Sequence, residues 1–219
     1  MRKFGNYFKR AFILTLILLL LCAVIYPLVL TGLGQLFFKK QANGNLIEIN
    51  GKAVGSELVG QAFEDDMYFH GRISSVNYNT YTEEEKEDGT YGGVSSGSFN
   101  YGATNPDLKD RVEADVQAFK DRYKEATGES FTGEIPADLL TASGSGLDPH
   151  ISPESAEVQV PIVAAASGLS EDEVKSIVDE NTEHKLLGIF GEERVNVLKC
   201  NIAIAEETGE IDSLTADAE

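Results

Sequence analysis

Cysteine and histidine are scarce in this chain of 219 residues. Cys22 lies in an apolar run and Cys200 lies far along the chain, which argues against an intrachain disulfide. The three histidines, His70, His150 and His184, are widely scattered, and no spacing of cysteine and histidine resembles a zinc site. The fold is therefore expected to rest on a packed core without cross-links.

Basic residues are scarce beyond residue 40. The first 40 residues hold six of the 18 basic residues and none of the 36 acidic ones. The remainder therefore has 12 basic residues against 36 acidic ones, a formal charge of −24. Such a domain repels nucleic acid and anionic lipid and attracts cations weakly, and solubility is the simplest reason for its charge. We expect no nucleic-acid partner.

Two catalytic motifs are missing. The sequence has no Gly-x-x-x-x-Gly-Lys loop that would hold nucleotide phosphates, and the glycine-rich stretch 91–98 has no adjoining lysine. The Gly-x-Ser-x-Gly elbow of serine hydrolases is also missing, because the nearest stretch reads Ser143-Gly144-Ser145-Gly146. These absences exclude the commonest routes to nucleotide hydrolysis and serine-based acyl transfer.

A long uncharged run is present near the N-terminus, from Ala11 to Phe38. A helix that rises ~1.5 Å per residue crosses a bilayer with ~20 residues, so residues 11–38 are long enough. A secretory signal has a shorter apolar region of ~7–15 residues and a small-residue cleavage pattern, and no such pattern follows here. The run predicts one retained transmembrane helix in the lipid bilayer.

The basic residues around this run predict its orientation. Four of them precede it and two follow it: Arg2, Lys3, Lys9 and Arg10, then Lys39 and Lys40. Because basic residues favour the cytoplasmic side, residues 1–10 should be cytoplasmic, and the domain 39–205 should lie outside the cell (inner or plasma) membrane. An acidic tail, 206–219, follows that domain.

Four residues in the outer half of the run could shape its packing. Pro27 can bend the helix. Thr31, Gly32 and Gly34 offer a small-residue face to a neighbouring helix. The run holds no charge, so a single copy cannot form an ion path. We interpret it as an anchor, a docking helix, or both.

The domain after the span is predicted to be α+β. Residues 46–55 alternate around Asn50-Gly51 and predict a hairpin. A short helix is expected at 56–63 and a strand at 67–71. The stretch 74–105 is rich in Ser, Asn, Gly, Tyr and Thr and predicts a long exposed loop or a partly disordered insertion.

Helix starts are the strongest local patterns in the second half. Asn105-Pro106 predicts a helix that ends at Gly128. Ser152-Pro153 predicts a second helix with a kink at Pro161 and an end at Gly168, Ser170 with Glu173 predicts a third, and residues 194–205 predict a strand that leads into a helix. The apolar stripe expected on the first helix is Leu108, Val112, Val116, Phe119 and Tyr123.

The stretch 141–152, TASGSGLDPHIS, gathers chemically useful side chains. A structural reading explains most of them: Gly144 and Gly146 permit positive φ, Asp148-Pro149 favours an extended turn, and Ser152 caps the next helix. This reading predicts a rigid joint made of Ser143, Gly144, Ser145, Gly146, Asp148, Pro149, His150 and Ser152. It leaves only His150 without a structural role, so His150 is the first candidate for a partner contact.

Two chemical readings of the same stretch stay open. Ser145 and His150 could serve an anchored extracellular hydrolase, although five residues is a short separation for such a pair. Asp148 and His150 could bind a metal if ligands such as His70 joined them. A third alternative is an anchored binding protein that acts alone. On the sequence we expect no catalytic residue, metal or cofactor in this chain.

Several stretches resemble, in order, the C subunit of the bacterial potassium-transporting P-type ATPase, the Kdp complex. They begin with QANGNLIEINGKAVGSELVGQAF at 41–63, YFHGR at 68–72 and GATNP at 102–106. TASGSGLDPHISPESAEVQV at 141–160 and GEERVNVLKCNIAI at 191–204 follow. With the single N-terminal span, the resemblance reaches from residue 12 to about 204.

The resemblance implies an accessory subunit without catalysis of its own in an ATP-driven, high-affinity potassium importer. In that family the A subunit translocates potassium and the B subunit hydrolyses ATP with Mg²⁺. The C subunit assembles and stabilises them and acts as a catalytic chaperone that raises the ATP affinity of the B subunit. If this domain is outside the membrane, such an effect on ATP has to be indirect.

This sequence departs from the family pattern at three places. Arg72-Ile73-Ser74 stands where Arg-Pro-Ser is usual, and Ile162 and Ser167 stand where arginines are usual. The stretch before GATNP also reads SSGSFNY in place of a Ser-Asn-rich form. These differences leave arginine-mediated contacts open.

Overall fold

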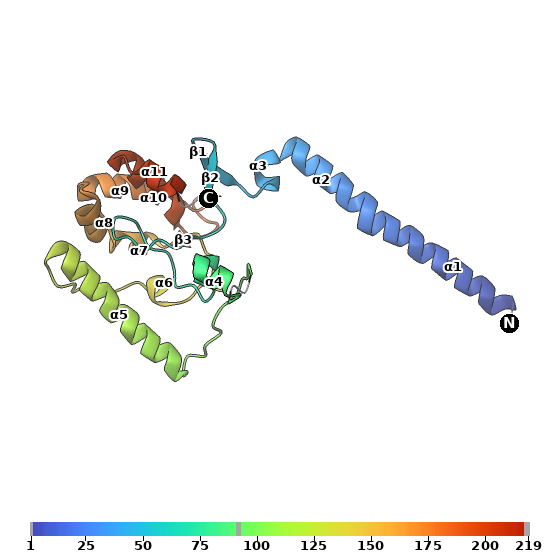
Figure 1. Ribbon diagram of the computed structural model, residues 1–219, viewed down its shortest axis with the longest axis horizontal. Helices are drawn as coiled ribbons and strands as arrows, with labels where there is room; N and C mark the ends of the chain where they lie inside the picture. The colour runs from blue at the N-terminus through green and yellow to red at the C-terminus, as the bar shows by residue number, and fades with distance from the viewer. Residues whose placement is uncertain (1, 91–92, 217–219) are drawn as a thin grey trace. The chain divides into compact units, whose positions relative to one another are not determined.

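The computed structural model describes residues 2–90 and 93–216. The chain divides into two compact units, Met1–Leu46 and Ile47–Glu219, which Figure 1 traces in colour from blue to red. The first is almost entirely helical, and the second combines many short helices with two small sheets. The predicted mixture of helix and sheet, with one apolar helix at the N-terminus, is confirmed.

The N-terminal unit is one long helical segment followed by a single turn. Its parts are α1 (Arg2–Leu19), a π-helical turn (Leu20–Ile25), α2 (Tyr26–Phe37) and α3 (Lys39–Ala42). The stretch Gly5–Phe37 is long and apolar enough to cross a membrane. An 18-residue window within it has a mean hydropathy of 2.9, and none of that window is buried. Apolar side chains on all sides of a helix are typical of a lipid environment, which suggests membrane association.

The π-helical turn lies directly before Pro27. A proline has no N–H, and its ring clashes with the carbonyl group four residues earlier in an α-helix. Here the N–H of Tyr26 donates to the carbonyl oxygen of Leu21, five residues back. The helix therefore widens before the proline, whereas the bend expected at Pro27 stays a prediction.

The small residues of α2 leave space beside the helix. Nothing within the N-terminal unit or elsewhere in the described chain lies within 4 Å of a Cβ placed on Gly32, and a Cβ on Gly34 would meet only the Cβ of Ala42, at 3.6 Å. The face of Thr31, Gly32 and Gly34 stays a prediction for helix packing.

The second unit begins within the predicted hairpin, which is made of β1 (Leu46–Ile49) and β2 (Lys52–Ser56). Asn50 has φ 51° and Gly51 has φ 78°. Two consecutive residues with positive φ form the turn whose twist matches that of paired strands, and Asn-Gly is the sequence that adopts it most readily. The hairpin prediction is confirmed.

Three of the predicted helices are confirmed. The side chain of Asn105 accepts from the N–H of Asp107 and starts α5 (Pro106–Thr127), and Gly128 ends it with φ 75°. Ser170 and Glu173 form both bonds of a capping box at α9 (Glu171–Glu180). Residues Arg194–Asn196 form β5, which leads directly into α10 (Val197–Thr208). On α5 only Phe119 is fully buried, and the rest of its apolar stripe is half-buried.

The helix expected from Ser152 to Gly168 is broken in two. Ser152 caps α7 (Pro153–Glu157), and α8 (Val160–Ser167) begins after Gln159, with Pro161 in its first turn. A proline in the first turn of a helix has no hydrogen bond to lose. The prediction of one helix kinked at Pro161 was therefore wrong, because the proline lies in the first turn of a new helix. Gly168 ends this helix with φ 78°.

A three-stranded antiparallel sheet lies among these helices in the order β3-β5-β4. Its outer strands are β3 (His150–Ile151) and β4 (Thr182–Glu183), and its register pairs His150 with Asn196. The short helix α6 (Ala137–Leu140) precedes β3, and α5 packs against α8. Neither β3 nor β4 was predicted, because two residues are too few to show the alternating pattern of a strand.

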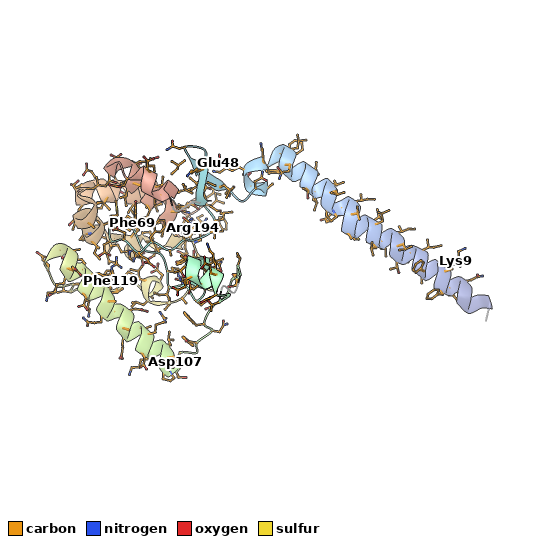
Figure 2. All side chains as sticks on the ribbon, in the orientation of Figure 1. Lys9, Glu48, Phe69, Asp107, Phe119 and Arg194 are labelled. Atoms are coloured by element: carbon orange, nitrogen blue, oxygen red, sulfur yellow. The ribbon has the colours of Figure 1, made fainter. Side chains whose placement is uncertain are left out.

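The hydrophobic core of the second unit lies between these helices and the sheet, with Phe69 inside the body of the unit (Figure 2). Its buried members come from α7 to α10, from β3 and β5, and from the loop at 68–69. They include Ile151, Val163, Val174, Val195 and Ile204. Cys200 is also fully buried, and burial raises the pKa of its thiol to about 12.

Two predicted elements between 56 and 71 were wrong. Residues 57–63 form turns and irregular chain in place of a helix, and residues 67–71 are irregular in place of a strand. The buried amide of Asn201 accepts from the N–H of Phe69 at 2.8 Å and donates to its carbonyl oxygen at 2.9 Å. Gln159 bonds the N–H and carbonyl groups of His70 in the same way. Side-chain amides thus replace the neighbouring strand that the apolar pattern led us to expect.

The stretch 74–105 is mostly irregular, as predicted, but it contains two short helical turns. These are a 3₁₀ turn at Asn77–Asn79 and α4 (Glu83–Glu87), which has a capping box at Thr82 and Glu85. Residues 91–92 lie outside the described part. At the C-terminal end α10 runs past residue 205 and α11 (Ile211–Ala216) follows, with Ile211 and Leu214 packed against the core.

Candidate functional site

The segment 141–152, here called the joint, is the meeting point of four parts of the second unit. It begins with a tight turn in which the hydroxyl of Ser143, 2% exposed, accepts from the N–H of Gly146 at 2.8 Å. Gly146 has φ 68°, as predicted, whereas Gly144 does not have a positive φ, so that part of the prediction was wrong. One residue with positive φ is enough for this turn, because the hydrogen bond from the Gly146 N–H to the Ser143 hydroxyl closes it.

The joint holds the 74–97 loop against the unit. The carbonyl oxygen of Ser145 accepts from the N–H of Gly97 at 2.8 Å and from the hydroxyl of Ser96 at 2.9 Å. The hydroxyl of Ser74 donates to the carbonyl oxygen of Gly146 at 2.6 Å. A loop of polar residues is thus fixed by backbone carbonyl groups, which was not visible in its composition.

Asp148 is the polar centre of the joint. One carboxylate oxygen accepts from the N–H of His150 at 3.0 Å, and the other faces the guanidinium of Arg72 at 3.1 Å. The hydroxyl of Tyr78 donates to the carbonyl oxygen of Arg72. Burial, followed by the nearby charge of Asp148, raises the pKa of Tyr78 to about 12. These contacts fix Arg72 in place.

His150 has a structural position in the sheet. As the first residue of β3 it pairs with Asn196, whose side-chain nitrogen lies 3.4 Å from its Nε2. Carboxylates of Asp148 and Glu183 lie 3.8 and 4.0 Å from its ring nitrogens. Burial, and next the charge of Arg194, lowers the pKa of this imidazole. The half-buried ring is neutral near pH 7 and has polar neighbours on both sides.

Ser152 ends the joint and caps α7, as predicted. Its hydroxyl accepts from the N–H of Ser155 at 3.1 Å and donates to Asp138, whose carboxylate also accepts from the Ser152 N–H at 2.7 Å. Burial would raise the pKa of Asp138, but hydrogen bonds from Ser155 and Ser152 lower it. Sequence reasoning missed Asp138, and a separation of 14 residues gave no pattern by which to find it.

The two chemical readings of the joint find little geometric support. The hydroxyl of Ser145 accepts from the N–H of Leu147, and no hydrogen bond joins Ser145 to His150 in the described chain. His70, the suggested third metal ligand, bonds Arg122 and the carbonyl oxygen of Asp65. Within residues 2–90 and 93–216, no group of three or more metal-ligating side chains is found. The joint acts as a connector of chain segments.

A second polar cluster lies where α5 meets the loop at 65–70. Arg122 donates to Nδ1 of His70 at 3.0 Å and to a carboxylate oxygen of Asp66 at 2.7 Å. Burial, and next the charge of Arg122, lowers the pKa of His70 to about 4. His70 is therefore neutral at pH 7 and accepts a hydrogen bond from a permanent cation.

This low pKa predicts that acid destabilises the domain through His70. The unfolded chain, with a histidine pKa near 6.5, binds a proton more readily than the folded chain between pH 6.5 and 4. The contribution of neutral His70 to the free energy of unfolding is thus complete above pH 6.5. It falls as the pH drops towards 4, and the loss has an upper limit on the order of 3 kcal/mol. Urea titrations of the full chain in mild detergent measure the free energy of unfolding. Between pH 6.5 and 4 this free energy should fall less for His70→Gln than for the wild-type chain.

The control for this prediction is His184→Gln. The side chain of His184 is 71% exposed, so this variant should keep the pH dependence of the wild-type chain. Parallel curves for the wild-type chain and His70→Gln would contradict the assignment to His70.

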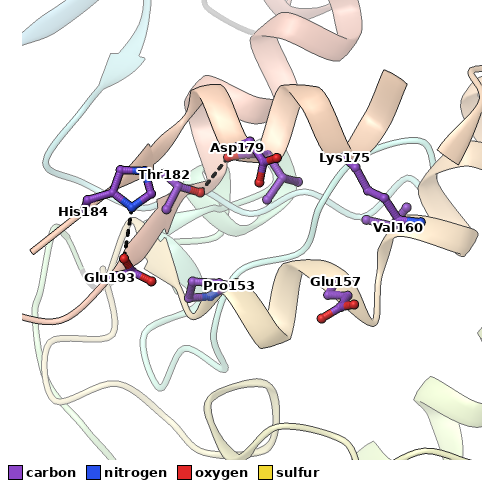
Figure 3. Close-up of a pocket in the computed structure, with 9 residues that line it drawn as sticks. Pro153, Glu157, Val160, Lys175, Asp179, Thr182, His184 and Glu193 are labelled. Atoms are coloured by element: carbon purple, nitrogen blue, oxygen red, sulfur yellow. Dashed lines mark hydrogen bonds and ion pairs between the residues drawn. The ribbon is translucent and has the colours of Figure 1, made fainter. Parts of the chain in front are cut away.

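A surface pocket of about 360 Å³ lies between α7, α9 and the end of the sheet (Figure 3). Thr182 donates to the carbonyl oxygen of Val178 at 2.7 Å at its wall, and His184 contacts Glu193 at 3.0 Å at its edge. Its charged lining is mostly acidic: Glu157, Asp179 and Glu193, with Lys175 opposite. In the described chain the Thr182 hydroxyl and the His184 ring thus each bond another group, and the pocket lies beside the hairpin that connects β4 to β5.

Comparison with known proteins decides the family. Residues 8–206 match the family model described as "K+-transporting ATPase, c chain". The chain belongs to this family. A protein of Clostridioides difficile named "Potassium-transporting ATPase KdpC subunit" is 56% identical over 92% of this chain and 97% of its own length. A protein of the same name from Clostridium kluyveri is 53% identical over 95% of this chain and 98% of its own length.

Membership in the c chain family confirms the resemblance drawn from the joint and the flanking stretches. The match begins inside the apolar helix and ends within α10, so it covers both units. The chain is therefore an accessory subunit of a potassium-transporting ATPase, in keeping with a helix that suggests membrane association.

Proposed function

We propose that this chain is a non-catalytic, single-span subunit that assembles and stabilises the potassium-translocating A subunit and the ATP-hydrolysing B subunit. The observation that carries the proposal is the long, largely apolar helix Gly5–Phe37, which is followed along the chain by a separate acidic unit. A chain built in this way offers one surface to partners within the bilayer and another in water. Potassium, ATP and Mg²⁺ belong to the complex, and no cofactor is assigned to this chain.

In this proposal the acidic unit lies outside the cell membrane, and the N-terminus lies in the cytoplasm. The support is the excess of basic residues before the helix compared with those after it. In this position the unit caps the outer mouth of the translocating subunit, and its negative charge raises the local potassium concentration within a screening length of ~8 Å. Promotion of ATP use by the B subunit is then transmitted through the complex, as a catalytic chaperone acting at a distance.

Within the bilayer, α2 packs on the translocating subunit through Thr31, Gly32 and Gly34, with Pro27 setting the path of the helix. The open space beside Gly32 supports this docking face. Small residues allow two backbones to approach closely, which is the main source of helix association in lipid.

The decisive experiment expresses the complex with and without this chain and measures co-purification in mild detergent and potassium-stimulated ATPase activity. We expect the wild-type chain to bring two larger membrane proteins with it, and its omission to abolish stable, potassium-stimulated activity. Full activity without the chain would disprove the proposal, and a chain that emerges alone would favour an anchored protein acting by itself.

The hydrolase alternative is tested in the same assay. Ser145→Ala removes the only candidate nucleophile of that reading and one hydrogen bond to the N–H of Leu147. Retained activity and co-purification would eliminate the hydrolase reading. Loss of both activity and co-purification, with an unchanged unfolding midpoint, would support a functional role for the Ser145 hydroxyl and keep the hydrolase reading open.

A further inference from the structure

The chain between β4 and β5 forms a projecting hairpin with an apolar tip, here called the finger (residues 184–193). Leu186 and Phe190 form an antiparallel bridge, with the N–H of each donating to the carbonyl oxygen of the other at 2.8 and 3.0 Å. Leu187 at φ 56° and Gly188 at φ 72° turn the chain. The tip of the finger is thus a tight turn closed by one bridge, whereas residues 184–185 and 191–193 below it belong to no strand.

Four large apolar side chains crowd this tip and are exposed. The exposed fractions are 69% for Leu186, 81% for Leu187, 75% for Ile189 and 62% for Phe190. Single exposed apolar side chains are ordinary on protein surfaces, but a contiguous group marks an interaction site. None of the side chains described in the second unit covers this group.

Two ion pairs and a contact between His184 and Glu193 link the two sides of the stem below the tip. Arg194 faces Glu183, His184 faces Glu193 at 3.0 Å, and Lys185 faces Glu192 at 3.4 Å. Opposite charges on facing positions favour one register of an antiparallel pair. They hold the tip out from the sheet with little help from the core, so the finger is positioned for an outside partner.

The charges of the stem favour a protein partner over a lipid surface. Elements that insert into membranes combine apolar side chains with lysine or arginine for the phosphate headgroups. Here each cation of the stem already faces a carboxylate, and the chain beyond residue 40 carries a formal charge of −24. What remains for a partner is the apolar tip alone.

We infer that the finger inserts its tip, Leu186 to Phe190, into an apolar cleft on the extracytoplasmic face of the potassium-translocating subunit. This inference rests on the proposed function, because it needs a partner subunit and the extracytoplasmic position. It assigns the docking of the acidic unit to a few desolvated apolar anchors, the kind of residues that dominate protein interfaces. The helix and the finger would then be two tethered contacts, each strengthening the other.

The first arm of the test compares subunit co-purification in mild detergent for the double variant Leu187→Ser/Phe190→Ser with Val94→Ser. Val94 is also 81% exposed but lies outside the finger, so it matches the loss of an exposed apolar side chain. We expect the finger variant to reduce recovery of the complex at least about tenfold, with the abundance and unfolding midpoint of the chain unchanged. Val94→Ser should behave as the wild-type chain.

The second arm asks whether lipid is the occupant. The chain contains no tryptophan, so Phe190→Trp places a single indole at the tip. The full chain alone is reconstituted into phosphatidylethanolamine/phosphatidylglycerol vesicles with brominated acyl chains. We expect the emission of a water-exposed indole without quenching.

Each outcome decides something different. Quenching by brominated lipid would assign the tip to the membrane and overturn the inference, as would equal recovery of the complex for the finger variant and the wild-type chain. A wild-type chain that recovers no partner subunit would overturn the proposed function and this inference together.

Discussion

Gly146→Ala should destabilise the second unit by about 3 kcal/mol, the cost of a left-handed backbone for alanine combined with overpacking. The φ of Gly146 is 68°, and a Cβ there would lie 2.8 Å from Cγ2 of Val76 and 2.9 Å from the carbonyl oxygen of Gly97. Neither neighbour can yield easily, because the loop that carries them is bonded to the joint at Ser145. The free energy of unfolding is measured by urea titration of the full chain in mild detergent, followed by circular dichroism.

Gly144→Ala is the matched control two residues away in the same turn. A Cβ on Gly144 meets nothing within 4 Å in the described chain, and its φ is not positive. We expect a change within about 0.5 kcal/mol, as for ordinary surface substitutions. Equal destabilisation by the two substitutions would show that the geometry of the joint is wrong, and it would return both glycines to the equivalent roles that the sequence predicted.

Asn201→Leu should lower the free energy of unfolding by about 4 kcal/mol. It leaves the buried N–H and carbonyl groups of Phe69 without partners, and each such group costs ~1–3 kcal/mol. The side chain of Asn201 is fully buried, and its two hydrogen bonds to Phe69 join α10 to the irregular loop at 67–71. The side chains of leucine and asparagine are similar in size, so the loss reports hydrogen bonding more than volume. Thermal and urea unfolding of the full chain measure it.

The control for this variant is Glu206→Leu, on the exposed side of the same helix. It adds an apolar side chain to α10 without removing a buried hydrogen bond, and it should leave the unfolding midpoint nearly unchanged. Asn201→Asp keeps an acceptor for the N–H of Phe69 but loses the donor and buries a carboxyl group, so it should also be destabilising. A neutral Asn201→Leu would mean that the loop is held by its apolar side chains alone.

Helix termini were predictable because their chemistry is local. A capping side chain bonds an N–H two or three residues away, so Asn105, Ser152 and Ser170 marked their helices without knowledge of the rest of the fold. The Asn50-Gly51 turn was predictable for the same reason. The break before Pro161 was predicted only as a kink, because the sequence could not show where the next helix would begin.

The finger has a recognisable pattern in the sequence. Four apolar residues around Gly188 stand between Lys185 and Glu192, and the charges at facing positions on the two sides of the turn, Lys185 with Glu192 and Glu183 with Arg194, are opposite in sign. That order is typical of a hairpin with paired charges, but its function depends on the tip being uncovered, which is a property of the folded chain.

The sequence by itself determined the apolar helix, the mixed fold, the family and most of the joint, because spacing, caps and turn residues act over a few positions. Only the tertiary structure decided what the joint connects. It brings Arg72 to Asp148, Asp138 to Ser152, and Asn201 to the loop that was expected to be a strand. His150, the residue left without a role, is placed between β5 and two carboxylates. These pairings join residues 14 to 132 positions apart, and packing of the whole core fixes such contacts, for which no local rule exists.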